Sequence, residues 1–313
     1  MKRLIKKCLS ILLVFFAVTL CTFLLISLAP SDAAEIMLSK TGVPASPEVL
    51  EKTREEMGLN RPVLVQYGSW LSDVLRGNMG TSYRSSHPVA EELLKAFPFT
   101  LKLTLLAMAM VILISFLLGI ISARYQNRLP DKIIGFFSYL FVAMPSFVLG
   151  LMLMYILCVK LHWFRVTPEP GIKGYVMPAV VMALSLSAWY TRQIRTIVLR
   201  EWHQDYVTGA RARGVSERRI LYSHILKNSM IPILTLLGNT FAMLLGGTTI
   251  VENIFSIPGA GYLIIESIGY RDYPVLQAYV LCMAVIFLIV NGLIDVSYSW
   301  IDPRVRKAGK NHG

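Results

Sequence analysis

Long apolar stretches alternate with short polar segments along this 313-residue chain. Five stretches contain no ionisable side chain other than Cys or Tyr, and each is long enough for a helix that crosses a bilayer, which takes about 17–25 residues. They are Cys8–Ala29, Leu103–Ala123, Ile133–Val159, Asn228–Val251 and Tyr273–Ile294. A sixth stretch, Gly174–Thr191, is shorter and contains Pro178. The pattern predicts six transmembrane helices and an all-α membrane protein.

The largest polar segment, residues 30–98, lies between the first and second predicted helices. Within it, Ser46 and Pro47 precede a mixed charged run, which predicts a short helix capped by Ser46. Residues 62–75 predict a second helix, and Gly77–Gly80 a turn. The chain therefore divides into a tail with the first helix at 1–29, an outer loop region at 30–98, a core with helices two to six at 99–302, and a cytoplasmic tail at 303–313.

Proline and small polar residues interrupt the third and fifth predicted helices. Pro145 predicts a kink in the third helix, because proline lacks the backbone N–H. Broken helices often line the path of a transporter, and the candidates for a pathway or gate are Met144, Pro145, Ser146, Asn239 and Thr248. The alternatives are an ordinary kink in the third helix and close helix packing through small residues in the fifth.

The positive charge of the chain follows its predicted topology. The formal net charge is +12, although only 16% of the residues are charged. A basic chain can indicate nucleic-acid binding. With the N-terminus in the cytoplasm, however, nineteen Lys and Arg flank the cytoplasmic ends of the helices and four occupy the two short outer loops. The positive-inside rule then places both termini and residues 192–227 in the cytoplasm and argues against nucleic acid as a partner.

The sequence offers no candidate for catalysis. Its four cysteines lie in or beside predicted helices and lack the spacing of a zinc site. No paired Asp, Ser/His pair or metal set stands at membrane depth, and no G-x-x-x-x-G-K-[ST] phosphate loop occurs. We expect a transport subunit rather than an enzyme, with no catalytic residue, metal site or cofactor of its own.

A strongly basic segment, residues 201–228, separates the fourth and fifth predicted helices. Residues 205–213 predict a short helix that ends at Gly214, because glycine tolerates the left-handed conformation that follows many helix ends. Ser216 predicts the cap of a second helix, with Glu217 at its positive N-terminus. The segment could contact anionic lipid headgroups, but the fixed shape that two opposed caps imply favours docking of another protein.

This segment and the residues after it resemble the EAA loop of certain inner-membrane permeases. The matching residues are Asp205-Tyr-Val-Thr-Gly-Ala-Arg-Ala-Arg-Gly-Val-Ser-Glu-Arg-Arg219 followed by His224-Ile-Leu-Lys-Asn-Ser-Met-Ile-Pro232. These permeases belong to binding-protein-dependent ABC importers of the dipeptide/oligopeptide/nickel family. Thr208-Gly-Ala210 stands in place of Glu-Ala-Ala, and Gly209 departs from the motif's Ala. Similar blocks follow in family order at Met57–Tyr67, Gly77–Arg84, Val251–Gly261, Arg271–Gln277 and Asp302–Arg306.

The resemblance implies the type I ABC importer permease fold in a bacterial inner membrane, with an outer loop domain between helices one and two. It also implies a second homologous permease, two ATPase subunits that bind ATP and Mg²⁺, and an extracytoplasmic substrate-binding protein. The residues expected to couple to an ATPase are Asp205, Thr208, Gly209, Ala210, Arg211, Arg213, Gly214, Ser216, Glu217, Arg218 and Arg219. We expect nickel or a nickel chelate as cargo, with dipeptides or oligopeptides as the alternative. A membrane receptor or scaffold without transport is the alternative from another class.

Overall fold

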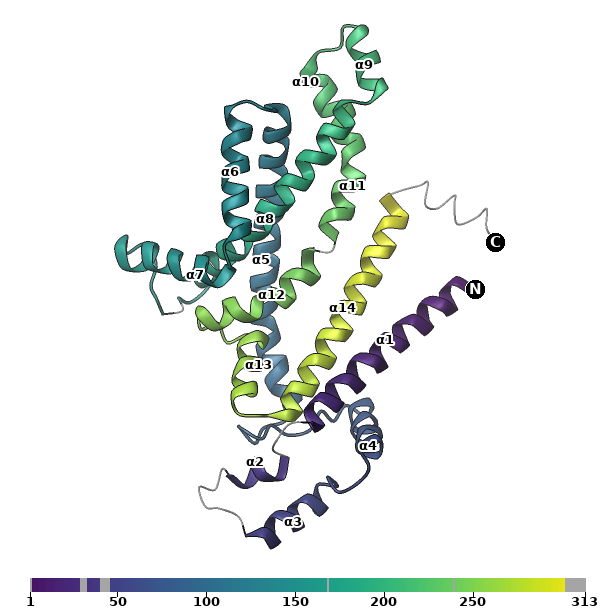
Figure 1. Ribbon diagram of the computed structural model, residues 1–313, viewed down its shortest axis with the longest axis vertical. Coiled ribbons are helices and arrows are strands. Elements are labelled where there is room, and N and C mark those ends of the chain that lie inside the picture. The colour runs from purple at the N-terminus through teal and green to yellow at the C-terminus, as the bar shows by residue number, and fades with distance from the viewer. Residues whose placement is uncertain (1, 29–32, 40–45, 168, 239, 302–313) are drawn as a thin grey trace. The chain divides into compact units, whose positions relative to one another are not determined.

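The computed structural model describes residues 2–28, 33–39, 46–167, 169–238 and 240–301 (Figure 1). The regular elements in these ranges are helices, and one isolated bridge joins Thr81 and Pro88. The predicted all-α class is therefore confirmed. Contacts divide the chain into two compact units, Met1–Pro98 with Pro258–Ile289 and Phe99–Ile257 with Val290–Gly313.

Most of the predicted membrane spans are present as helices. Four stretches among the described residues are long and apolar enough to cross a membrane: α5 (Val89–Arg124), α8 (Lys173–Trp202), Glu217–Ile254 and Tyr273–Leu293. A bent pair of helices at residues 129–160 is a fifth candidate. Helix α1 (Lys2–Ser27) covers the predicted first span as far as Ser27. Its 26 residues reach about 39 Å at 1.5 Å per residue, against a hydrocarbon core of about 30 Å.

In the first unit, three short helices follow α1: α2 (Ala33–Ser39), α3 (Pro47–Glu56) and α4 (Val63–Leu75). Helix α3 begins as predicted, since the Ser46 hydroxyl accepts a hydrogen bond from the Val49 N–H at 3.3 Å and Pro47 is the first helical residue. Both helices predicted in the outer loop region are confirmed.

Helix α4 packs on the last turns of α1. The Thr19 and Tyr67 hydroxyls form a hydrogen bond of 2.9 Å, and the Phe23 ring lies 5.6 Å from the Tyr67 ring and 6.1 Å from Trp70. Elsewhere in this unit, α13 (Ala260–Gly269) and the start of α14 (Tyr273–Ile301) bury apolar side chains against the start of α5. These are Val89, Leu93, Ala96, Ala260, Leu263, Val275 and Ala278.

Helix α8 organises the second unit. Tyr190, Ile194 and Val198 recur every four residues on one face and are almost fully buried, as the helical period requires of a core-facing stripe. Helix α5 approaches this face closely at Gly119, where an added Cβ would lie only 2.7 Å from the Ile194 side chain. Such close approach through a small residue is how membrane helices gain van der Waals contact.

The third predicted span is broken rather than kinked. Helix α6 (Leu129–Ala143) and the following α7 (Ser146–Met154), which continues as a π-helix η1 (Tyr155–Lys160), are bent by 105°. Pro145 is responsible, because it lacks an N–H and forces the preceding Met144 into an extended conformation with φ −88° and ψ 127°. The expectation of one kinked helix over Ile133–Val159 understated this break.

Candidate functional site

The loop at residues 201–228 forms two short helices joined by a tight turn. Helix α9 (Asp205–Ala212) is followed by α10 (Glu217–Arg219), and a π-helix η2 (Ile220–Ile225) then leads into α11 (Leu226–Gly238). Figure 1 shows α9 and α10 together at the tip beyond the end of α8 and the start of α11. The chain continues after residue 239 as α12 (Thr240–Ile254). The predicted helix–turn–helix is thus present.

Gly214 closes the turn in the predicted left-handed conformation, with φ +77°. The Gly214 N–H donates to the Arg211 carbonyl at 2.9 Å, and the Val215 N–H donates to the Ala210 carbonyl at 3.2 Å. These two bonds are the Schellman pattern that satisfies the last carbonyls of a helix. A side chain at Gly214 would meet no atom within 4 Å, so the backbone conformation alone demands glycine.

The cap of the second helix differs from the prediction. Ser216 occupies the N-cap position with φ −62° and ψ 143°, but its side chain makes no capping hydrogen bond. Helix α10 lasts only three residues before the π-helix η2 begins, whereas the capped α3 has ten. Across the turn, the Arg211 guanidinium instead donates to both Glu217 oxygens at 2.6 and 3.2 Å. This ion pair is solvent-exposed and contributes less than about 1 kcal/mol.

The inner face of the loop is fixed to the helices on either side of it. Val207, Ala210, Ile220, Leu221 and Ile225 are almost fully buried in one cluster with the α8 stripe described above. The Tyr206 hydroxyl also donates to the Glu201 carboxylate at 2.9 Å. A displacement of the loop must therefore carry α8 and α11 with it.

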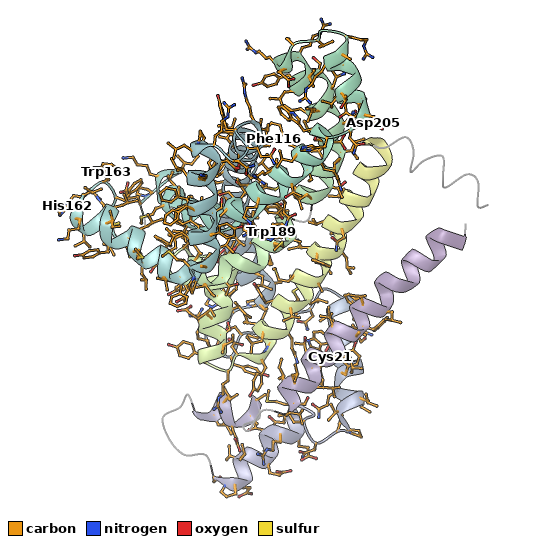
Figure 2. All side chains as sticks on the ribbon, turned by 45° about the horizontal axis from the view of Figure 1, so that its top comes forward. Cys21, Phe116, His162, Trp163, Trp189 and Asp205 are labelled. Atoms are coloured by element: carbon orange, nitrogen blue, oxygen red, sulfur yellow. The ribbon has the colours of Figure 1, made fainter. Side chains whose placement is uncertain are left out.

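The outer face of the loop is basic and exposed. Its exposed side chains include Thr208, Arg211, Arg213, Arg218 and Arg219, and Figure 2 shows Asp205 where α9 begins. Gly209 is part-buried inside α9, and an added Cβ there would lie 3.6 Å from the Arg213 guanidinium, an ordinary contact. A rigid backbone with arginines on one side and an apolar anchor on the other is suited to bind a protein surface and transmit displacement.

The predicted pathway residues do not form one described cluster. Met144, Pro145 and Ser146 are partly or largely exposed at the break between α6 and α7. Thr248 is fully buried, and its hydroxyl donates to the Leu245 carbonyl of its own helix at 2.9 Å. Asn239 lies outside the described residues. The pathway assignment of these residues stays a prediction.

A buried carboxylate in the first unit joins two segments that are far apart in sequence. Asp272 is fully buried and accepts hydrogen bonds from the Ser82 hydroxyl at 2.5 Å and from the Tyr83 and Arg84 N–H groups at 3.0 Å each. The Arg84 side chain donates to Glu266 at 2.6 Å. We call this arrangement the Asp272 clamp. The two sides of the clamp belong to the separate sequence blocks Gly77–Arg84 and Arg271–Gln277, and no signal in the sequence pairs these blocks.

Tyr83 is part of the same arrangement. Burial raises the pKa of its phenol to about 12, and the negative charge of Asp272 adds to the rise. The tyrosine therefore stays neutral at physiological pH beside a carboxylate that is held by three donors.

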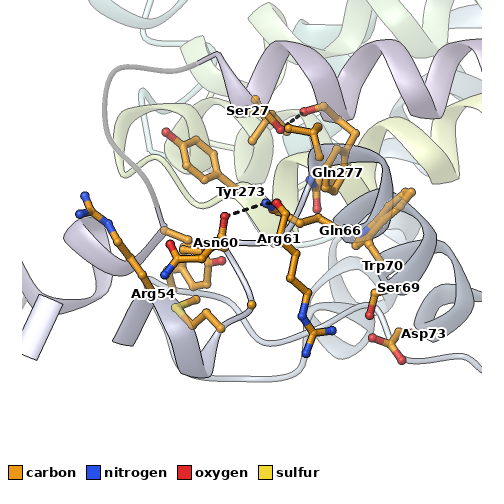
Figure 3. Close-up of a pocket in the computed structure, with 18 of the residues that line it drawn as sticks. Ser27, Arg54, Asn60, Arg61, Gln66, Ser69, Trp70, Asp73, Tyr273 and Gln277 are labelled. Atoms are coloured by element: carbon orange, nitrogen blue, oxygen red, sulfur yellow. Dashed lines mark hydrogen bonds between the residues drawn. The ribbon is translucent and has the colours of Figure 1, made fainter. Parts of the chain in front are cut away.

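A cavity of about 580 Å³ lies beside the clamp within the first unit. Figure 3 shows Asn60 and Arg61, Ser69, Trp70 and Asp73 of α4, and Tyr273 and Gln277 of α14 around it. The Gln66 amide spans the turn before α4 by donating to the Leu59 and Arg61 carbonyls at 2.8 Å each. The wall is thus built from segments separated by two hundred residues of sequence.

The structure thus combines helices long and apolar enough to cross a membrane with an exposed, anchored basic loop. Residues 115–307 match the family described as the inner membrane component of binding-protein-dependent transport systems, and residues 1–104 match the N-terminal region of such membrane components. The chain therefore belongs to this family, the permeases of ABC importers.

Curated relatives extend along almost the whole chain. The glutathione transport system permease protein GsiC of Escherichia coli (strain K12) is 33% identical over 302 residues, which cover 96% of this chain and 98% of the relative. The protein of the same name from Salmonella typhi is 34% identical over the same coverage.

Solved transporters share the fold at low identity. A crystal structure of an amino acid ABC transporter with histidines matches with a TM-score of 0.54 and 18% identity, covering 67% of this chain and 94% of that chain. The inward-facing MetNI methionine ABC transporter matches with a TM-score of 0.54 and 14% identity, covering 67% and 96%. These likenesses support the type I ABC importer permease fold predicted from the sequence.

Proposed function

We propose that this chain forms one half of the translocation path of an ATP-driven importer, and that its 201–228 loop transmits the movement of an ATPase subunit to the membrane helices. The observation that carries the proposal is the division of this loop into an exposed basic face and a buried face continuous with α8 and α11. Lipid binding needs only the charge, whereas force transmission needs both faces and a fixed turn.

Membership of the family supports the assembly that we propose. A second permease completes the path, two ATPase subunits bind ATP and Mg²⁺ at the cytoplasmic side, and a substrate-binding protein delivers cargo from the other side. The charge asymmetry of the sequence supports a cytoplasmic position for the 201–228 loop and both termini.

For the cargo we propose short peptides of about the size of glutathione, a tripeptide. The sequence alone favoured nickel or a nickel chelate, with peptides as the alternative. The alternative gains support from relatives that are named for glutathione transport and align over 96% of this chain.

Uptake by cells with and without the gene tests the cargo. Deletion should abolish vanadate-sensitive uptake of labelled glutathione or of a labelled dipeptide and leave nickel uptake unchanged. Lost nickel uptake with normal peptide uptake would restore the nickel assignment. Cargo-dependent signalling without any ATP-driven uptake would favour the receptor alternative.

A further inference from the structure

A second cavity, of about 360 Å³, opens among α5, α6 and α8 in the second unit. Its wall includes Ser122 from α5, Asp131 and Tyr139 from α6, and Arg192 and Arg195 from α8. The cavity lies at the boundary between charged and apolar residues in both α8 and α6. Arg192 directly follows the uncharged stretch Gly174–Thr191, and Asp131 precedes the apolar run of α6.

The negative charge in this cavity is already neutralised. Asp131 accepts hydrogen bonds from Arg195 Nε at 2.8 Å and Nη2 at 2.7 Å, from the Asn127 N–H at 2.8 Å, and from the Ser122 hydroxyl. Four donors satisfy this carboxylate, and Arg195 balances its charge. Any further cation in the cavity wall is therefore not balanced by Asp131.

Arg192 is such a further cation. Its guanidinium lies over the Tyr139 ring at 4.6 Å from the centroid, a cation–π contact that orients the group. Among the described residues, no carboxylate forms an ion pair with Arg192. With Asp131 and Arg195 cancelling, the cavity wall carries one net positive charge.

The cavity wall also includes a buried hydroxyl. Thr191 lines the cavity, is only 1% exposed, and its hydroxyl has no hydrogen-bond partner among the described residues. A buried polar group without a partner costs about 1–3 kcal/mol. This hydroxyl has almost no accessible surface, so a ligand oxygen pairs with it only once the Thr191 side chain turns toward the cavity. A cation next to such a hydroxyl suits a phosphate group.

Beside the cavity, α6 presents an apolar surface. Phe136, Tyr139 and Leu140 are spaced three and four residues apart, and therefore share one helix face. They are 64%, 64% and 40% exposed, respectively. A free phosphate ion would gain nothing from this surface, whereas an amphiphile would cover it with its acyl chains.

We propose that this cavity binds the headgroup of an anionic phospholipid, with Arg192 and Thr191 at the phosphate and the exposed face of α6 along an acyl chain. Basic pockets between membrane helices are suited to such headgroups. The proposal goes beyond the import function and does not depend on the cargo.

The test is the binding of dioleoyl phosphatidylglycerol to the purified full-length chain, with dioleoyl phosphatidylcholine as the uncharged reference, measured by native mass spectrometry. Arg192→Gln should weaken retention of phosphatidylglycerol by at least about tenfold, since a charge-assisted hydrogen bond is lost. Arg192→Lys should weaken it less, because the charge remains. Thr191→Val preserves the shape of the side chain and should cause a smaller loss.

Arg200→Gln is the matched control, since Arg200 is exposed on the same helix outside the cavity. This variant should bind phosphatidylglycerol as the wild type does. Equal loss in both arginine variants, or none in Arg192→Gln, would overturn the proposal. Displacement of the lipid by millimolar inorganic phosphate would overturn it as well and identify a site for free anions.

Discussion

The same substitution, glycine to alanine, should have opposite effects on stability at two positions of the 201–228 loop. It should destabilise the turn at Gly214 and stabilise helix α9 at Gly209. Gly214 has φ +77° and no neighbour within 4 Å of an added Cβ. Gly214→Ala therefore costs only the left-handed backbone strain of an L-residue, about 1–2 kcal/mol. Gly209 lies inside α9, where an added Cβ makes an ordinary contact at 3.6 Å. Gly209→Ala should stabilise this helix by about 0.5–1 kcal/mol, because alanine loses less backbone entropy.

Hydrogen exchange of the chain reconstituted in lipid nanodiscs measures both changes locally. In Gly214→Ala, amides of residues 205–215 should lose protection by about 5- to 30-fold, the factor that corresponds to 1–2 kcal/mol. In Gly209→Ala the same amides should be equally or better protected. Unchanged protection in Gly214→Ala, or lower protection in Gly209→Ala, would refute the assignment of the strain to the turn.

The remaining predictions concern the first unit and the topology. Asp272→Asn should accelerate proteolysis between residues 77 and 88, because one amide oxygen cannot accept from all three donors. An unsatisfied donor costs about 1–3 kcal/mol. An unchanged rate of proteolysis would contradict the role of Asp272 in the clamp. Tyr83 should ionise near pH 12 rather than near pH 10, so the stability from its buried neutral form should persist below about pH 10 and fall between pH 10 and pH 12. A phenolate absorbance step near pH 10 that Tyr83→Phe removes would disprove its burial. In a background without native cysteines, an impermeant thiol reagent should label Lys52→Cys in intact cells and Ser216→Cys only after permeabilisation, and the reverse pattern would invert the topology.

The 201–228 loop could be predicted because its determinants are local. Glycine after a short helix has one dominant structural use, and Gly214 adopts it. The prediction that the Ser216 hydroxyl caps the second helix was wrong. Exposure is not the reason, since Ser46 is also exposed and does cap α3; α10 differs in lasting only three residues before the π-helix η2 begins, and Arg211 engages Glu217 across the turn. Local pattern identifies the turn but does not decide between competing side-chain partners.

The Asp272 clamp and the Asp131–Arg195 pair could not be predicted from local pattern. Asp272 and Ser82 are separated by 190 positions and Asp131 and Arg195 by 64, and a periodicity of 3.6 residues carries no information about such pairs. In the sequence, Arg195 indicates only the side of the membrane through its positive charge. The π-helices η1 and η2 also escaped prediction, because one extra residue in a helical turn leaves the apolar pattern nearly unchanged.

Photo-crosslinking within the assembled importer tests the central claim, that the exposed face of the 201–228 loop binds the ATPase. A photoreactive residue replaces Thr208 or Arg218, which are exposed on the loop, or Leu94, which is 73% exposed in the first unit. We expect adducts with the ATPase subunit from Thr208 and Arg218 and none from Leu94, with yields that change when ATP and vanadate are added. An intact complex without adducts from either loop position, or with equal adducts from Leu94, would contradict this claim.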